Sequence, residues 1–236
     1  MDSNIVKVGE WYYDEVSGWP WPPNCGSGKG QRPCLVPGGT CPIRTANILD
    51  PSSWRGWDGK DFSVTFADPY RGAVANPPAH VCVPVSNIDF STGFNFHAAT
   101  HLFIATLWTP MGTAYGPPGV YFTTSTDFVH WSKPALAITL NQLLKREPEG
   151  NWSYQYFSLI DPKSTDSSYA MITDNPYLYY VRMDDNHGPY QRVLFRQKIS
   201  LAWLTTPSRN SAPPSPAPGP PPHPTHVNNF SPPASH

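Results

Sequence analysis

The chain has little charge and no long apolar run. Only 14% of its 236 residues are Asp, Glu, Lys or Arg, and the net charge is −1. Because a phosphate backbone is held by a basic stripe, we expect no binding to nucleic acid. No apolar run approaches the ~18 residues that a membrane-spanning helix needs, so no membrane partner is expected.

Motifs that hold metals or phosphates are also lacking. The four cysteines have no Cys-x-x-Cys spacing. His97 and His101 stand four apart outside any expected helix, so they do not share a face as zinc ligands would. The Gly-rich residues 26–30 lack the spacing of a phosphate-binding loop. We therefore expect no metal and no cofactor.

No secretory signal opens the sequence, because residues 1–10 have neither a basic nor an apolar segment. Four cysteines are nevertheless disulfide candidates, with three possible pairings: Cys25, Cys34, Cys41 and Cys82. The first three lie in one stretch rich in Gly and Pro, so at least two of them are expected to pair. Two Asn-x-Ser glycosylation acceptors, at Asn151 and Asn229, also favour an extracellular or cell-wall location. In a cytosolic protein the cysteines would be free thiols.

Aromatic residues make up 14% of the chain, and they gather in short runs with β-branched neighbours. Such runs bounded by Gly and Pro are typical of strands. The expected strands are 10–16, 62–66, 81–85, 102–108, 120–124, 154–160, 177–183 and 192–201. A single helical turn is expected at 140–145. The sequence therefore predicts an all-β fold.

A weak repeat divides these strands into units. Asp50 and Trp54 stand four residues apart, as do Asp127 and Trp131, and the two pairs are offset by 77 residues. The Asp is expected to turn the chain and the Trp to fill the space between sheets. Repeated antiparallel units of this kind indicate propeller blades, at about 1–75, 76–150 and 151–204.

The last segment, 205–236, has a different composition. Eleven of its 32 residues are proline and Arg209 carries its only full charge. Such a segment cannot bury enough apolar surface to offset its ordering entropy, so we expect a disordered Pro-rich tail. It could be a plain stalk, or a contact for the cell wall or a Pro-binding module.

Three motifs resemble one family of proteins. Thr124 to Pro134 (TSTDFVHWSKP) resembles the S-x-D-x-x-x-W blade signature of the five-bladed β-propeller glycoside hydrolases of the family 43 and 32 type. Residues 157–162, together with 176–180, resemble the last part of the propeller sequence in a group of that class. Residues 50–59 resemble an earlier segment of the same sequences. The resemblance covers about residues 5–201. It implies a partial five-bladed propeller of about three four-stranded blades.

The resemblance also implies a sugar pocket with paired carboxylates, one protonating the leaving oxygen and the other activating water or attacking carbon. The chain departs from the family where the acid Glu belongs, since no Glu-Gly-Pro sequence occurs. Two catalytic candidates remain, Glu10 beside the first aromatic strand and Asp161 at a strand end. A turn-forming role for Asp161 is the competing hypothesis.

Two loop tryptophans, Trp19 and Trp21, are the candidates for stacking on sugar rings, and packing is their alternative role. The sequence thus predicts a carbohydrate-active protein of the propeller glycoside hydrolase class, incomplete and without activity, with an oligo- or polysaccharide as partner. The alternative is a non-catalytic glycan-binding or wall-associated module with a Pro-rich spacer.

Overall fold

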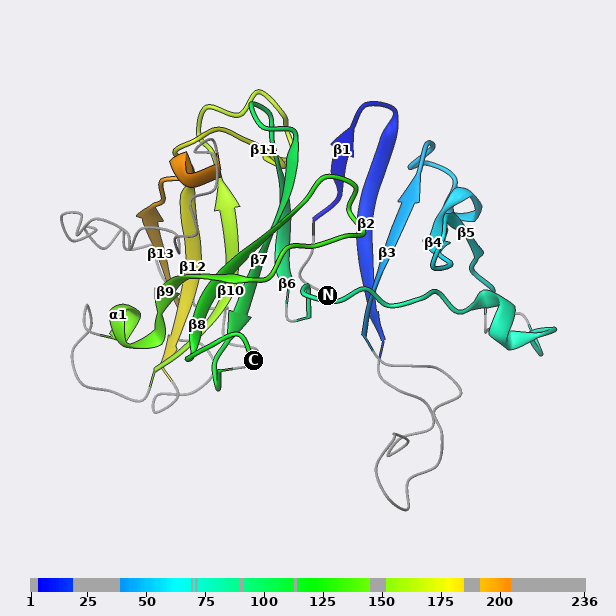
Figure 1. The fold of residues 1–236 in the computed structure, drawn as a ribbon, viewed down its shortest axis with the longest axis horizontal. Helices are drawn as coiled ribbons and strands as arrows, with labels where there is room; N and C mark the ends of the chain where they lie inside the picture. Colours follow the sequence, from blue (N-terminus) through cyan, green and yellow to red (C-terminus); the bar gives the residue numbers. More distant parts are fainter. Residues whose placement is uncertain are drawn as a thin grey trace, which may run out of the picture.

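The computed structural model describes residues 4–18, 39–68, 70, 72–89, 91–112, 114–144, 152–184 and 192–204. Strands make up 49% of the described residues and helices 9%, which confirms the all-β prediction. The strands form three mainly antiparallel sheets that lie side by side in Figure 1.

The first sheet is an antiparallel meander of five strands in chain order. Its strands are β1 (Val6–Val8), β2 (Trp11–Gly18), β3 (Gly39–Thr45), β4 (Arg55–Trp57) and β5 (Phe62–Thr65). A tight turn at Gly9, whose φ of 61° suits glycine, joins β1 to β2. A short 3-10 helix, η1 (Pro51–Ser53), precedes β4, and η3 (Pro77–His80) follows the sheet.

The second sheet has the order β11-β6-β7-β8-β9. Its antiparallel strands are β6 (Ser91–His97), β7 (Leu102–Thr109), β8 (Gly119–Ser125) and β9 (Ala135–Thr139). The two-residue β11 (Met171–Ile172) joins from later in the chain and runs parallel to β6. The helical turn expected at 140–145 is confirmed as α1 (Leu140–Leu144).

The third sheet holds β10 (Trp152–Ile160), β12 (Tyr177–Asp184) and β13 (Arg192–Lys198), with β12 in the centre. The 3-10 helix η4 (Ala202–Leu204) follows it. The first sheet lies within residues 1–75 and the third within 151–204, whereas the second takes β11 from beyond 150.

The strand expected at 81–85 is wrong. Only Val85 forms a bridge, to Thr40 of β3. Pro84 has no N–H to donate to a ladder, and its ring lies against Gly39. The segment therefore runs beside β3 without becoming a strand.

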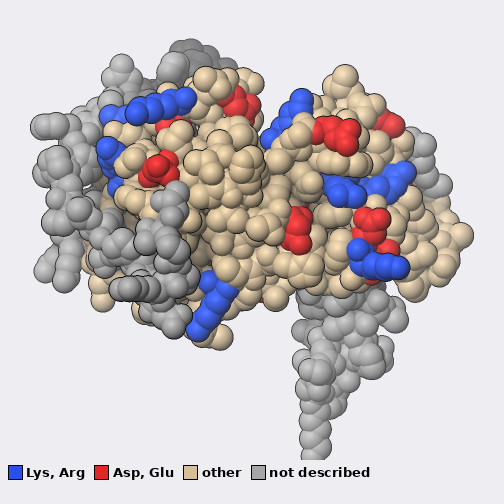
Figure 2. Space-filling model, turned by 45° about the horizontal axis from the view of Figure 1, so that its top comes forward, with Lys and Arg blue, Asp and Glu red and all other residues tan. Residues whose placement is uncertain are grey.

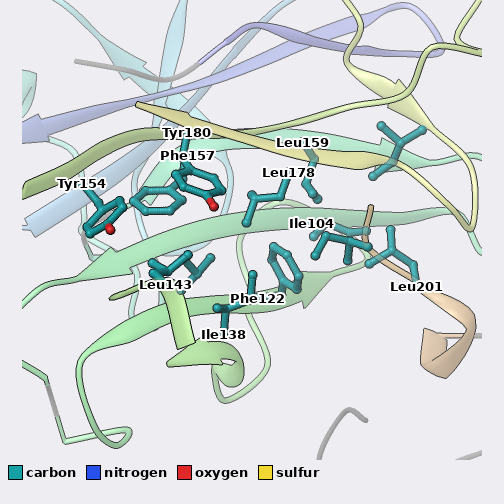
Figure 3. Packing of buried hydrophobic residues seen from close by; sticks show 13 residues of the cluster. Ile104, Phe122, Ile138, Leu143, Tyr154, Phe157, Leu159, Leu178, Tyr180 and Leu201 are labelled. Atoms are coloured by element: carbon teal, nitrogen blue, oxygen red, sulfur yellow. The ribbon is translucent and has the colours of Figure 1, made fainter. Parts of the chain in front are cut away.

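Two hydrophobic clusters fill the spaces between neighbouring sheets. The larger one fills the space between the second and third sheets, where Ile104 and Phe122 meet Phe157 and Tyr180 (Figure 3). The other lies around Phe94, Phe103 and Phe128 of the second sheet. From the first sheet it receives Val6, with Val8 and Tyr13 packed against it.

All three sheets meet along β6. The backbone N–H of Phe94 donates to Asn4 Oδ1 (2.9 Å), just before β1. On the other side, Thr92 Oγ1 donates to the carbonyl oxygen of Phe157 in β10 (2.6 Å). Gly93 lies between these bonds, with Asn4 and Ser158 close to the place of its missing Cβ. The strands β1, β6 and β10, one from each sheet, are therefore neighbours (Figure 1).

The Asp/Trp repeat occupies matching places in the first two sheets. Each pair lies between the third and fourth strand of an antiparallel run, β1 to β4 and β6 to β9. Asp50 caps η1 through the N–H of Ser52, and Asp127 accepts the N–H groups of Val129 and His130. The prediction that Asp turns the chain is therefore confirmed in both copies.

The two tryptophans of the repeat differ in burial. Trp131 is 7% exposed, packs against Phe94 and Phe128, and donates its ring N–H to the Phe128 carbonyl. Trp54 is only half-buried, at the start of the short β4. The packing role is thus confirmed for Trp131 and holds only in part for Trp54.

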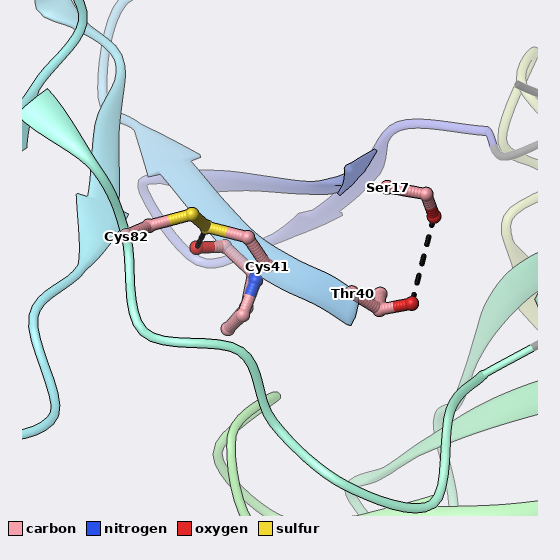
Figure 4. Close-up of a disulfide and its surroundings, with 5 residues drawn as sticks. Ser17, Thr40, Cys41 and Cys82 are labelled. Atoms are coloured by element: carbon pink, nitrogen blue, oxygen red, sulfur yellow. Dashed lines mark hydrogen bonds between the residues drawn. A yellow bond between two sulfur atoms is a disulfide. The ribbon is translucent and has the colours of Figure 1, made fainter. Parts of the chain in front are cut away.

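One disulfide is present among the described residues, and it joins two of the four candidate cysteines. Cys41 bonds to Cys82 across 41 residues, with a Cα–Cα distance of 6.1 Å (Figure 4). Because Cys41 of β3 is bonded to Cys82, it does not pair with Cys25 or Cys34. Pairing of Cys25 with Cys34, the remaining form of the prediction, lies outside the described residues. The bond ties the segment after η3 to the first sheet.

Candidate functional site

The most unusual carboxyl group among the described residues is Glu15, in the middle of β2. Side chains alternate along a strand, so Tyr13 and Glu15 share a face. Tyr13 packs against Phe103 and Phe128 of the second sheet. The same face therefore carries Glu15 into the junction between the first two sheets, where it is only 4% exposed.

One oxygen of Glu15 has a partner and the other does not. Ser91 Oγ, at the start of β6, donates to Glu15 Oε1 (2.6 Å). Oε2 is buried and accepts no hydrogen bond in the described structure. Burial raises the pKa of Glu15 to about 7, against the bonding of Ser91, which lowers it. A neutral carboxyl is the form that a buried site favours.

Two more acids surround this group and form with it an acidic junction of Asp14, Glu15 and Asp89. After burial and the Ser91 bond, the negative charge of Asp14 raises the pKa of Glu15, and Asp89 does so to a smaller extent. Burial also raises the pKa of Asp89. Burial and then the Asp89 charge raise that of the nearby Tyr115 hydroxyl.

The acidic junction can bind a proton near neutral pH. A carboxyl with a pKa of about 7 exchanges protons at the pH where general acids work best. With 4% exposure, however, Glu15 has no room to meet a sugar in this conformation. No group of three His, Cys, Asp or Glu that could hold a metal occurs within the described ranges.

Sequence interpretation missed Glu15, although the pattern held a clue. In the expected strand 10–16, Glu15 falls on the same face as Trp11 and Tyr13. The aromatic face of a strand packs into the core, so a carboxylate on that face is expected to be buried with it. The sequence pattern pointed to Glu10 as the catalytic candidate instead.

The structure does not pair Glu10 with Asp161. Glu10 is exposed in the turn between β1 and β2, whereas Asp161 follows β10 and is 1% exposed. Asp161 accepts the N–H of Lys163 through Oδ1 (2.9 Å) and that of Thr173 through Oδ2 (2.7 Å). The Thr173 hydroxyl also donates to Oδ2.

These bonds decide the charge of Asp161. Burial alone would raise its pKa, but the hydrogen bonds of Thr173 and of the Lys163 amide outweigh it and lower the pKa. The carboxylate therefore stays ionised with both oxygens engaged, as a turn-forming residue does. A catalytic role for Glu10 or Asp161 stays a prediction.

A second polar cluster ties a hairpin to a loop. His97, fully buried at the end of β6, shares hydrogen bonds with Thr100 Oγ1 (2.8 Å) and Asp174 Oδ1 (3.0 Å). The row of hydroxyl, imidazole and carboxylate has the order of a nucleophilic triad. Thr100, however, lies three residues after His97 in the β6–β7 turn, so the row joins this turn to the loop before β12.

The remaining predicted site residues lie outside the described residues. They are Trp19, Trp21, Cys25, Cys34 and the segment 205–236. Sugar stacking by the two tryptophans therefore stays a prediction.

No protein-family model matches this chain, and no curated protein is significantly similar to it. Among the described residues, none of the helices has the length and apolarity to cross a membrane. Figure 2 shows basic and acidic side chains in small separate groups on one face of the molecule, in keeping with the low charge.

Proposed function

We propose that the chain is a carbohydrate-binding protein of the propeller glycoside hydrolase type, which binds an oligo- or polysaccharide without hydrolysing it. The observation that carries this proposal is the meeting of three antiparallel sheets along β6. Asn4 before β1 and Phe157 of β10 both bond to residues 92–94. Blades around a propeller axis bring their inner strands together in this way.

The turn motif supports the same proposal. The segment Thr124 to Pro134, which resembles the family's blade signature, forms the connection between the third and fourth antiparallel strands of the second sheet. Its Asp127 makes the turn and its Trp131 fills the core.

We expect no turnover because of where the candidate carboxyl groups lie. Glycosidic cleavage needs two carboxyl groups on either side of one bond, about 5–9 Å apart. Glu10 is exposed in the first sheet, and Asp161 has both oxygens engaged beside the third. The buried Glu15 does not reach the surface.

The proposal includes an extracellular or cell-wall location, which is oxidising. The Cys41–Cys82 bond supports it, because disulfides persist in extracellular spaces and are rare in the cytosol.

The test is calorimetry of the purified chain with arabinan, xylan, galactan and fructan oligosaccharides, run beside hydrolysis of the matching aryl glycosides. We expect binding to at least one glycan and no turnover above background. Binding to none of the glycans contradicts the proposal. Turnover that disappears in Glu10→Gln or Asp161→Asn contradicts the non-catalytic part of it.

A further inference from the structure

The outer face of the third sheet carries tyrosines and exposed cations. In the β12–β13 register, Tyr177 stands opposite Lys198, Tyr179 opposite Arg196, and Met183 opposite Arg192. Residues that stand opposite each other share a face of the sheet. The alternate residues Leu178 and Tyr180 point into the core between the second and third sheets. The tyrosines and cations therefore face away from that core.

A bulge in β10 adds a third ring to this face. The pairing with β12 shifts between Gln155 and Ser158, so an extra residue is inserted there. Phe157 stays fully buried and stacks on Tyr180, while Tyr156 is 40% exposed. Tyr156 has a φ of 59°, in a region that bulky residues rarely adopt. Such bulges re-aim a side chain, often next to a functional site.

Two of these cations, Arg192 and Arg196, lie against tyrosine rings. The guanidinium carbon of Arg196 is 5.1 Å from the Tyr177 ring centroid, and that of Arg192 is 5.9 Å from the Tyr156 ring. The side chains of Arg192, Arg196 and Lys198 are exposed. Within the described structure, none of the three forms an ion pair with an acid. We call these six residues, Tyr156, Tyr177, Tyr179, Arg192, Arg196 and Lys198, the basic tyrosine face.

We propose that the basic tyrosine face binds an anionic polysaccharide, with its carboxylate or sulfate groups on the cations and its sugar rings against the tyrosines. The inference rests on the proposed carbohydrate function and specifies the class of glycan. Charge complementarity carries it, because three exposed cations on one strand have no acidic partner among the described residues. Arginine binds planar carboxylate and sulfate-like groups through two parallel hydrogen bonds. Tyrosine offers a flat apolar ring with a polar tip.

The experiment compares charged and neutral forms of the same polymers. Binding of the whole chain is measured by affinity electrophoresis and calorimetry with polygalacturonate and its methyl ester, and with dextran sulfate and dextran. We expect the charged member of at least one pair to bind and its neutral counterpart to bind far more weakly. A preference for polygalacturonate identifies carboxylates as the ligand groups, and a preference for dextran sulfate identifies sulfates. Binding should weaken as salt rises.

Variants locate the binding surface. Arg192→Gln with Arg196→Gln should weaken binding about tenfold or more, because charge-assisted hydrogen bonds to the anion are lost. Tyr179→Ala should weaken it without changing the net charge. The matched control is Lys60→Gln with Lys133→Gln, which removes the same charge from exposed positions in the β4–β5 and β8–β9 connections. The melting temperature of each variant shows whether it is folded.

The outcomes are distinct. An equal loss in the control pair overturns the inference, because net charge alone would then explain binding. Equal binding of neutral and charged polymers overturns it too, yet leaves the proposed carbohydrate function standing. Failure to bind any glycan contradicts both proposals. Tighter binding of single-stranded oligothymidylate than of either charged glycan would assign the face to nucleic acid.

Discussion

At the scale of the residue, Glu15 links the pH of the solution to the contact between the first and second sheets. Its carboxyl has a pKa of about 7 in the folded chain, against an ordinary value of 4.5. Between these two values the folded state keeps a proton that the unfolded state releases. The free energy of unfolding therefore falls by about 3 kcal/mol at most as the pH rises from 4.5 to 7. Above pH 7 it levels off.

Glu15→Gln tests this linkage, because the amide keeps the shape of the neutral carboxyl. We expect the variant to lose the fall in stability between pH 4.5 and pH 7, and to exceed the parent chain in stability above pH 7. Urea unfolding across this range measures both. Glu10→Gln is the matched control, since Glu10 is exposed in the β1–β2 turn. An unchanged pH dependence in Glu15→Gln would show that another group carries it.

At the scale of the element, the two Asp/Trp connections allow a direct comparison. Trp131 is enclosed by Phe94 and Phe128, so Trp131→Ala should cost about 3–5 kcal/mol of unfolding free energy. Trp54 is half-buried, so Trp54→Ala should cost less than half as much. Denaturant unfolding of both variants decides the matter. Equal costs would mean that the two connections are equivalent in energy as well as in position.

The Cys41–Cys82 bond is the second feature at this scale. It closes a loop of 41 residues, so its loss should lower the free energy of unfolding by about 4 kcal/mol through loop entropy in the unfolded chain. Replacing both cysteines by serine and measuring urea unfolding gives this value. Adding a reductant should destabilise the parent chain far more than the double variant. A reductant effect of equal size in both would place the stabilisation elsewhere.

These elements also show what the sequence could and could not predict. Strands rich in aromatic and β-branched residues, such as β7 and β12, were found from composition and alternation. The segment 81–85 was misjudged because Val83 and Val85 donate single N–H bonds to Trp57 of β4 and Thr40 of β3, while Pro84 between them has no N–H to continue a ladder. Pairing of Cys41 with Cys82 depends on where β3 lies in space, which no local pattern contains. The same holds for Ser91, which meets Glu15 only after two sheets pack.

At the scale of the whole molecule, the two junctions between the sheets differ in how many apolar residues they bury. The second and third share a large cluster in which both contribute fully buried residues, among them Ile104 and Leu178. The first sheet contributes one fully buried residue, Val6, to its cluster with the second, and places Glu15, whose Oε2 accepts no hydrogen bond in the described structure, at that junction. Proteins open first where apolar burial is least.

We therefore expect the first sheet to open before the other two, and to do so more readily at pH 7 than at pH 4.5. Hydrogen exchange followed by mass spectrometry should show faster exchange in β2 and β3 than in β7 and β8, after correction for intrinsic rates. Between pH 4.5 and pH 7 the opened state releases the Glu15 proton that the closed state keeps, so the difference between the sheets should widen over this range and stay constant above pH 7. In Glu15→Gln the difference should remain but no longer grow with pH. Equal protection of all three sheets would mean that the chain opens as one unit, and that the buried carboxyl does not weaken the junction selectively.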